Sequence, residues 1–316
     1  KKRGFMDWSS LSSTEEEAEG EAKRPYVKYS GHHGWVLSVL EHQGRIFSGG
    51  MDKTVRVLDA ASGENIAVLE TDEMEPLDLD PGAVMSLAVA GNMLWGGTSN
   101  GVLHVWDLDT FELLGQLGAS GDERFHPDHR HEGGIEQICA LGNVVHRGWA
   151  HNAMGDAVVT ACCDGIMRIW GADESRKCLA VLEGHTNAVF AMCFSEEHPE
   201  ELLSGSRDWT IRQWDLSTLQ CLRVIETDAL FPVYALARIG GFVVSAPEDG
   251  SITVWNASTW EVERSLEGHG VFYTYEDARG RPANMTRQCP VSSLLPLVGP
   301  ASLSTEALGK RQREGE

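Results

Sequence analysis

The sequence is short of positive charge. It has 26 Lys and Arg residues against 47 Asp and Glu residues, a formal net charge of −21. Proteins that bind nucleic acid neutralise its phosphates mainly with Lys and Arg. Arg56, Arg168 and Arg212 recur at one offset within a repeat described below, so they belong to that repeat and form no basic patch. The composition therefore argues against direct binding of nucleic acid.

Long apolar runs are also missing. No stretch approaches 18 apolar residues, which argues against a membrane span, and no signal peptide precedes the first repeat. The seven cysteines are an odd number, and four of them (Cys139, Cys162, Cys163 and Cys193) fall in predicted strands. We interpret them as thiols of a reducing compartment, the cytoplasm or the nucleus. No nucleotide-binding loop, nucleophile elbow or paired-carboxylate site stands out, so no cofactor and no enzymatic activity are predicted.

What the sequence does contain is a repeated all-β unit. Residues 182–216 alternate through Val189, Ala191 and Cys193, cross a polar bend, and alternate again from Leu202 to Ser206. After a tight turn at 207–208 a third alternating run ends at Trp214-Asp215. Alternation of period two between turn residues predicts short, half-buried strands. The three runs predict an antiparallel meander.

The same strand ending recurs five times. It lies at Leu58, Trp106, Trp170, Trp214 and Trp255, at spacings of 41 to 64 residues, and the longest interval carries an insertion around 142–156. A four-stranded propeller blade takes roughly 40–45 residues. Each copy is a small sheet that cannot cover both of its faces, so neighbouring copies are predicted to stack and share a core.

Gly184-His185 and Trp214-Asp215 are the motifs by which the chain resembles the WD-repeat (WD40-type) β-propeller family. The resemblance implies four-stranded antiparallel blades: five units at about 32–70, 80–118, 131–183, 185–227 and 229–267, plus an incomplete sixth that includes 290–297. It also implies part of a seven-bladed ring, with residues 25–30 closing the last blade. We predict a propeller over 25–299, a disordered acidic and Ser-rich segment over 1–24, and a disordered tail over 300–316.

In the family, a His, a Ser or Thr, an Asp and a Trp form a hydrogen-bonded set that ties each blade together. The resemblance implies two complete sets here: His131, Thr160, Asp164 and Trp170 in one, and His185, Ser204, Asp208 and Trp214 in the other. The first copy has His32, Ser48 and Asp52 but Leu58. The second keeps only Trp106. The fifth has Ser245, Asp249 and Trp255 with Ala229 in place of His. Buried polar groups of this kind must find partners, so we interpret the sets as structural and not as a hydrolytic triad.

The resemblance also marks the positions of each blade that contact partners. Among them we expect a protein-binding surface rich in aromatic residues, Met and Arg, as interface centres are. Its predicted residues are Trp35, Leu37, Met51, Met85, Phe190, Arg207, Tyr234 and Glu248. Arg207 is the one Arg at these positions, beside Glu136 and Glu248, which disfavours a phosphopeptide and favours a basic or apolar segment of a partner protein.

We predict a non-enzymatic scaffold or adaptor, a subunit of a protein complex that binds neither nucleic acid nor membrane. Two alternatives stay open. One is the substrate-recruiting subunit of a ubiquitin ligase. The other is a metal-dependent enzyme, because His126, Asp128, His129 and His131 lie close in sequence and His146 and His151 follow in the insertion. Their spacing matches no metal-binding motif, so no metal site is predicted.

Overall fold

The computed structural model describes residues 29, 31–71, 82–118, 131–141, 156–194, 198, 200–227 and 231–266, and the backbone of 270–276 and 282–288. The chain divides into two compact units, residues 1–30 and 31–316, and every sheet described here lies in the second. The sixth unit at 290–297, the links at 72–81 and 119–130, the histidines at 126, 129, 146 and 151, and both predicted tails lie outside the described residues.

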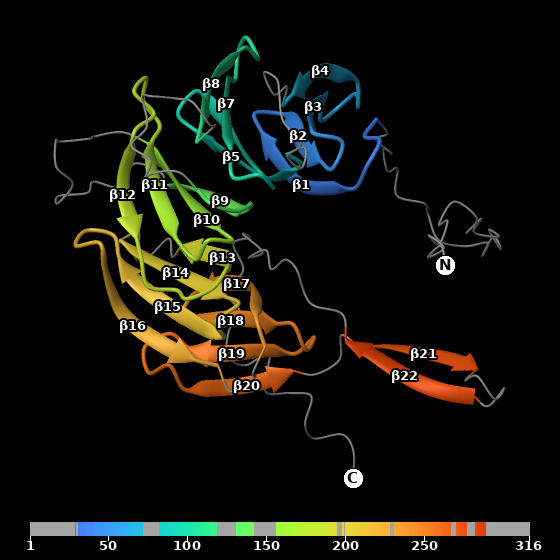
Figure 1. Cartoon of the computed structure of the whole chain (residues 1–316), viewed down its shortest axis with the longest axis vertical. Helices are drawn as coiled ribbons and strands as arrows, with labels where there is room; N and C mark the ends of the chain where they lie inside the picture. The colour runs from blue at the N-terminus through green and yellow to red at the C-terminus, as the bar shows by residue number, and fades with distance from the viewer. Residues whose placement is uncertain are drawn as a thin grey trace. The chain divides into compact units, whose positions relative to one another are not determined.

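The described strands form five four-stranded antiparallel sheets, each a meander of four consecutive strands (Figure 1). We number the sheets 1 to 5 along the chain. Sheet 1 contains β1 (Val36–His42), β2 (Arg45–Gly50), β3 (Thr54–Asp59) and β4 (Asn65–Glu70). Sheet 2 contains β5 (Val84–Ala90), β6 (Met93–Thr98), β7 (Leu103–Asp107) and β8 (Leu113–Leu117). Sheet 3 contains β9 (Ile135–Leu141), β10 (Ala157–Cys162), β11 (Met167–Gly171) and β12 (Cys178–Leu182).

Sheet 4 contains β13 (Val189–Phe194), β14 (Glu201–Ser206), β15 (Thr210–Asp215) and β16 (Gln220–Glu226). Sheet 5 contains β17 (Val233–Ile239), β18 (Phe242–Pro247), β19 (Ile252–Asn256) and β20 (Val262–Leu266). The predicted all-β fold with four-stranded units is confirmed. The described residues include no helix, and therefore none that could cross a membrane.

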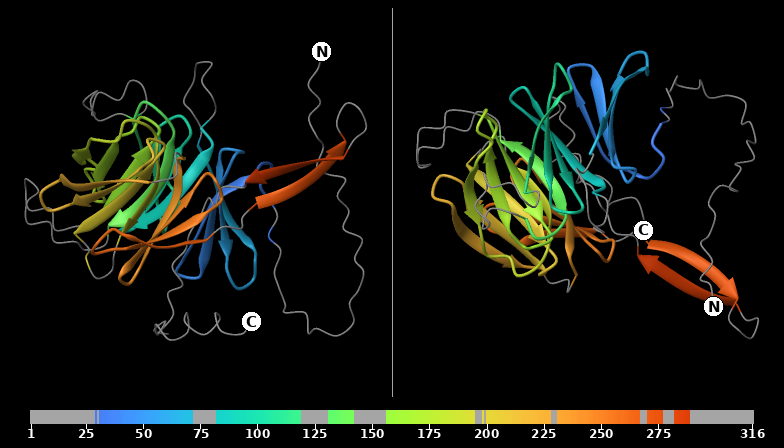
Figure 2. Two further views of the ribbon diagram at one scale, coloured as in Figure 1. Left: turned by 90° about the horizontal axis from the view of Figure 1, so that it is seen from below. Right: turned by 45° about the horizontal axis from the view of Figure 1, so that its top comes forward.

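Consecutive sheets share one core each. The first strands of neighbouring sheets, β1, β5, β9, β13 and β17, lie next to one another, and the sheets stand side by side in both views of Figure 2. Four apolar clusters fill the interfaces, and each combines residues of two consecutive sheets. Phe47 of sheet 1, for example, packs with Leu87 of sheet 2. Glycine allows the close approach: a Cβ on Gly97 would lie 2.5 Å from Ile135 Cγ2 of the next sheet.

The two sheets at the ends of this series each have one described neighbour. Val36 and Val39 of sheet 1 are 48% and 64% exposed. The residues at the same two positions of sheets 2 to 5 are buried: Val84, Leu87, Ile135, Ile138, Val189, Met192, Val233 and Leu236. On the outward side of sheet 5, Phe242 and Leu266 are also exposed. Both end sheets therefore present an apolar face among the described residues.

Two local expectations were wrong. Simple alternation places Val189 and Ala191 on one face, but Val189 packs in the core with sheet 3 and Ala191 in the core with sheet 5. The cause is a β-bulge at Phe190, where Val189 pairs with Ser206 and Ala191 with Gly205. The sequence before residue 290, rich in Arg, Pro and Asn, predicts an interruption of the repeat, whereas β21 (Gly270–Glu276) and β22 (Pro282–Gln288) form an antiparallel hairpin. Its β-branched and aromatic residues, such as Val271 and Phe272, favour a strand.

Candidate functional site

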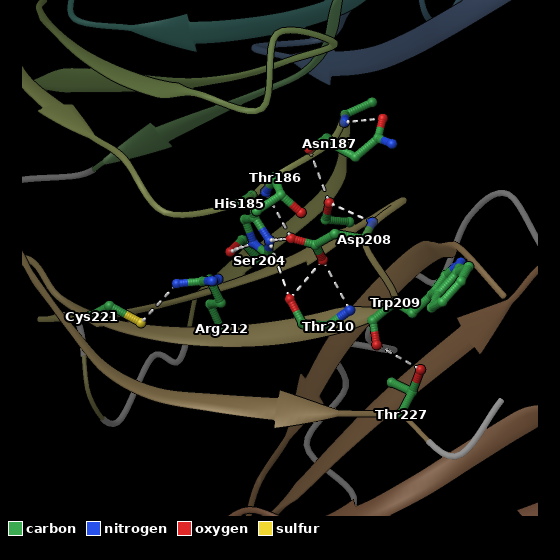
Figure 3. Close-up of polar contacts among 12 residues, drawn as sticks. His185, Thr186, Asn187, Ser204, Asp208, Trp209, Thr210, Arg212, Cys221 and Thr227 are labelled. Atoms are coloured by element: carbon green, nitrogen blue, oxygen red, sulfur yellow. Dashed lines mark hydrogen bonds and ion pairs between the residues drawn. The ribbon is translucent and has the colours of Figure 1, made fainter. Parts of the chain in front are cut away.

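A polar network links the segment before β13 to β14 and β15 of sheet 4, and Figure 3 shows its part around His185, Ser204 and Asp208. The Trp214 indole N–H donates to Ser204 Oγ at 2.8 Å, and Ser204 Oγ lies 2.7 Å from His185 Nε2. His185 Nδ1 lies 2.8 Å from Oδ2 of Asp208, and the other carboxylate oxygen, Oδ1, accepts from the Thr210 hydroxyl. One tautomer satisfies every member: Nδ1–H donates to Asp208, and Nε2 accepts from the Ser204 hydroxyl.

This network cannot act as a hydrolytic triad. Ser204 is fully buried, and its oxygen already has two partners, so no substrate can reach it. Burial lowers the pKa of His185 more than Asp208 raises it, which keeps the imidazole neutral at pH 7. Burial raises the pKa of Asp208, but hydrogen bonds from His185 and Thr210 outweigh it and hold that pKa below its usual range. The arrangement satisfies buried polar groups and ties the strands together.

Sheet 3 has the second complete set with a different proton arrangement. Trp170 Nε1–H donates to Thr160 Oγ1 at 3.0 Å, and Thr160 Oγ1 lies 2.7 Å from His131 Nε2. Arg168 Nη1 lies 2.7 Å from His131 Nδ1 and 2.9 Å from Asp164. Since a guanidinium can only donate, Nδ1 of His131 accepts and its proton sits on Nε2. Two equivalent histidines thus use opposite tautomers.

The position of Arg168 argues against a metal ion bound within the polar set of sheet 3. Ligand atoms of His131, Cys162 and Asp164 lie within 4.8 Å of one another, close enough to hold an ion. The Arg168 guanidinium, however, contacts both His131 and Asp164 there and neutralises the carboxylate. Burial raises the pKa of the Cys162 thiol, which keeps it protonated. The three residues therefore fit a guanidinium rather than a metal cation.

The remaining sheets carry partial sets. In sheet 1, His32 bridges Ser48 Oγ and Asp52, both at 2.9 Å, and Leu58 replaces Trp. In sheet 5, Trp255 Nε1–H donates to Ser245 Oγ at 2.8 Å. Sheet 2 lacks the hydroxyl because Gly96 stands there, and buried His104 occupies the position of the Arg in sheets 1, 3 and 4. Among the described residues, neither ring nitrogen of His104 has a hydrogen-bond partner. Sequence reasoning missed this residue, although it stands at the offset of Arg56 and Arg168.

Every first strand of the five sheets carries the same β-bulge near its start. In each of these strands one residue has no partner on the neighbouring strand. It lies between Val36 and Ser38, Val84 and Ser86, Ile135 and Gln137, Val189 and Ala191, and Val233 and Ala235. We call these five residues the bulge row: Leu37, Met85, Glu136, Phe190 and Tyr234. A bulge redirects a side chain, and bulges are common beside binding sites. None of the five is buried.

A recurring backbone hydrogen bond places a second row beside the first. The residue before the turn of each sheet donates its N–H to the carbonyl two residues before the bulge: Met51 to Trp35, Ser99 to Ala83, Cys163 to Gly134, Arg207 to Ala188, and Glu248 to Pro232, all at 2.8 to 3.0 Å. The turn residues therefore lie at the same edge of every sheet as the bulge row. We call the bulge row, these five turn residues and Trp35 the bulge face. All eight predicted partner-binding residues belong to it.

Aromatic and charged groups gather where sheets 3, 4 and 5 meet on the bulge face. The rings of Phe190 and Tyr234 stack with centroids 4.7 Å apart and an interplanar angle of 16°. The Cys163 thiol donates to Glu136 Oε1 at 3.0 Å. Burial raises the pKa of Tyr234, the carboxylates of Glu248 and Glu136 raise it further, and Arg207 lowers it, so all three charges act on one phenol. At the other end of the face, Trp35 is 76% and Met51 51% exposed.

Sequence and structure comparisons agree on the kind of repeat and on the fold. The family model "WD domain, G-beta repeat" (WD40) matches residues 23–59 and 176–215. The chain contains WD40 repeats and has a β-propeller fold. Among solved structures, the WD40 β-propeller domain of Doa1 has 18% identity and a TM-score of 0.57, covering 81% of this chain and 77% of that one. U3-55K has 18% identity and a TM-score of 0.63, covering 84% and 72%. The five sheets are blades of a WD40 propeller.

The curated relatives are longer proteins, and their similarity to this chain covers only part of each. Mitochondrial division protein 1 of Mycosarcoma maydis is 30% identical over 203 residues, which are 62% of this chain and 22% of that protein. Transducin beta-like protein 3 of Rattus norvegicus is 26% identical over 250 residues, 70% of this chain and 31% of that protein. The chain thus spans less than a third of the length of either. WD40 propellers generally mediate protein–protein interactions within complexes and generally lack enzymatic activity.

Proposed function

We propose that this propeller is a non-enzymatic scaffold that binds partner proteins through its bulge face, as a subunit of a cytoplasmic or nuclear complex. The observation that carries the proposal is the repeated bulge. Five blades of different sequence redirect one side chain each to the same edge, beside five turn residues positioned by one recurring hydrogen bond. Three of these side chains are aromatic or Met, and exposed Trp35 and Met51 extend the apolar surface.

The residue types support an interface better than a solvated rim. Aromatic residues, Met and Arg are enriched in interface centres, and truncating such residues typically costs more binding energy than truncating their neighbours. The two complete sets, around His131 and His185, are buried and hydrogen-bonded inside the blades, so they offer no reacting group to a ligand at this edge. All six described cysteines are free thiols, as expected of a reducing compartment.

Affinity purification of the full chain followed by quantitative mass spectrometry tests the proposal. Trp35→Ala combined with Phe190→Ala should reduce recovery of the specific partners at least tenfold, while the melting temperature stays within about 3 °C. Leu222→Ala combined with Val224→Ala is the matched control, since both side chains are exposed on β16, away from the bulge face. Equal recovery by both double variants would refute the assignment of the bulge face.

A further inference from the structure

We propose that the Phe190–Tyr234 part of the bulge face binds a lysine or arginine side chain from an extended segment of the partner protein. This inference rests on the proposed function and names the chemistry of its ligand. The two rings come from adjacent bulges on blades 4 and 5 and stack closely, at 4.7 Å between centroids. Nothing inserts between rings at that spacing, and both side chains are partly exposed, so a ligand would contact the stack from outside. Aromatic faces attract cations.

Two carboxylates flank the platform. Glu136 occupies the bulge of blade 3, next along the row from Phe190. The backbone N–H of Glu248 donates to the carbonyl of Pro232, two residues before Tyr234, at 3.0 Å, and its carboxylate raises the pKa of Tyr234. Neither glutamate has an ion pair in the described parts of the chain: Glu136 accepts only from the neutral Cys163 thiol, and Glu248 is exposed. A cation on the Tyr234 ring would therefore meet two carboxylates that have no counterion of their own.

The one basic residue of the bulge face does not fill this role. Arg207 is exposed and forms no ion pair with any described residue, although Glu136 and Glu248 lie close enough to act on the same phenol. In the proposed complex, the guanidinium of Arg207 would donate hydrogen bonds to backbone carbonyls of the bound segment. With two acidic residues and one basic residue, the face keeps the negative sign of the whole chain, whose formal net charge is −21. That field draws in basic segments and repels phosphorylated ones.

A phage-displayed library of random dodecapeptides, selected on the immobilised full chain, tests the inference. Peptides selected by the wild type should be enriched in Lys and Arg. The dissociation constants of the synthesised peptides should rise about tenfold in the variant Glu136→Gln combined with Glu248→Gln, and the same peptides should weaken as salt increases. Glu112→Gln combined with Glu261→Gln changes the net charge equally at exposed sites at the opposite ends of their blades, and should change the constants less than twofold.

The outcomes separate the two proposals. Peptides that lose binding to Phe190→Ala but keep it in the double Gln variant, or that lack basic residues, would overturn the cation site and leave the docking face standing. Peptides that bind the wild type, Phe190→Ala and Trp35→Ala alike would count against the docking face itself. Selection of acidic peptides would reverse the inferred sign of the ligand and overturn the inference.

Discussion

Replacing Ser204 by Ala tests whether the polar network of blade 4 stabilises the fold. The change removes the acceptor of the Trp214 indole N–H and the donor to His185 Nε2, at 2.8 and 2.7 Å, in a position with no exposed surface. Leaving a buried polar group without a partner costs about 1–3 kcal/mol. Two such groups predict a loss of about 3 kcal/mol in the free energy of unfolding.

Blade 5 supplies a matched comparison. Ser245 Oγ also accepts from a tryptophan, Trp255, at 2.8 Å, but no histidine bond to it is recorded among the described residues. Ser245→Ala therefore leaves one group without a partner and should cost about half as much, roughly 1.5 kcal/mol. Urea unfolding at pH 7.5, followed by circular dichroism and tryptophan fluorescence, measures both variants. If Ser204→Ala costs no more than Ser245→Ala, the stabilising role assigned to the histidine is refuted.

Three further changes probe other features. Burial lowers the pKa of His104 to about 4, compared with about 6.5 in the unfolded chain. The fold is therefore not destabilised by protonation of His104 above pH 6.5, and it loses stability as the pH falls from 6.5 towards 4. His104→Phe should remove this pH dependence of the urea midpoint and stabilise the fold by about 1 kcal/mol. Gly97→Ala places a Cβ 2.5 Å from Ile135 and should cost about 2 kcal/mol, whereas Gly241→Ala, with open space around it, should cost less than about 0.5 kcal/mol, as thermal unfolding would show. Burial and a hydrogen bond to Glu136 raise the pKa of Cys163 to about 12, so Glu136→Gln should speed its alkylation by iodoacetamide at pH 8; an unchanged rate would contradict the contact.

The order of the strands could be predicted from the sequence pattern, and the members of the polar sets were implied by the family resemblance. Alternation of period two and the recurring Trp endings marked the third strands correctly, and His185, Ser204, Asp208 and Trp214 do hydrogen-bond to one another. The partner-contact positions came from the family resemblance, and in the structure they lie along one edge of the sheets.

The bulges could not be predicted from alternation. Around Phe190 the apolar residues Val189, Ala191 and Met192 fit either face of a strand, so the hydrophobic pattern does not reveal the extra residue. The bulge exists because the next strand pairs Ser206 with Val189 and Gly205 with Ala191, and that choice depends on the two neighbouring cores. The proton positions on His131 and His185 also depend on tertiary contacts, because Arg168 reaches its histidine whereas Arg212 contacts Cys221.

The unequal surroundings of the five blades have a consequence for how the molecule opens. Blades 2, 3 and 4 are held by cores on both sides, whereas blades 1 and 5 each have a single described partner, and Val36 and Val39 meet water. In arrays of stacked modules, stability is close to a sum over modules and their junctions, so a module with one junction separates at lower free energy. Amide hydrogens of β1–β4 and β17–β20 should therefore exchange with deuterium before those of β9–β12, and loss of structure should progress inward from the outermost modules.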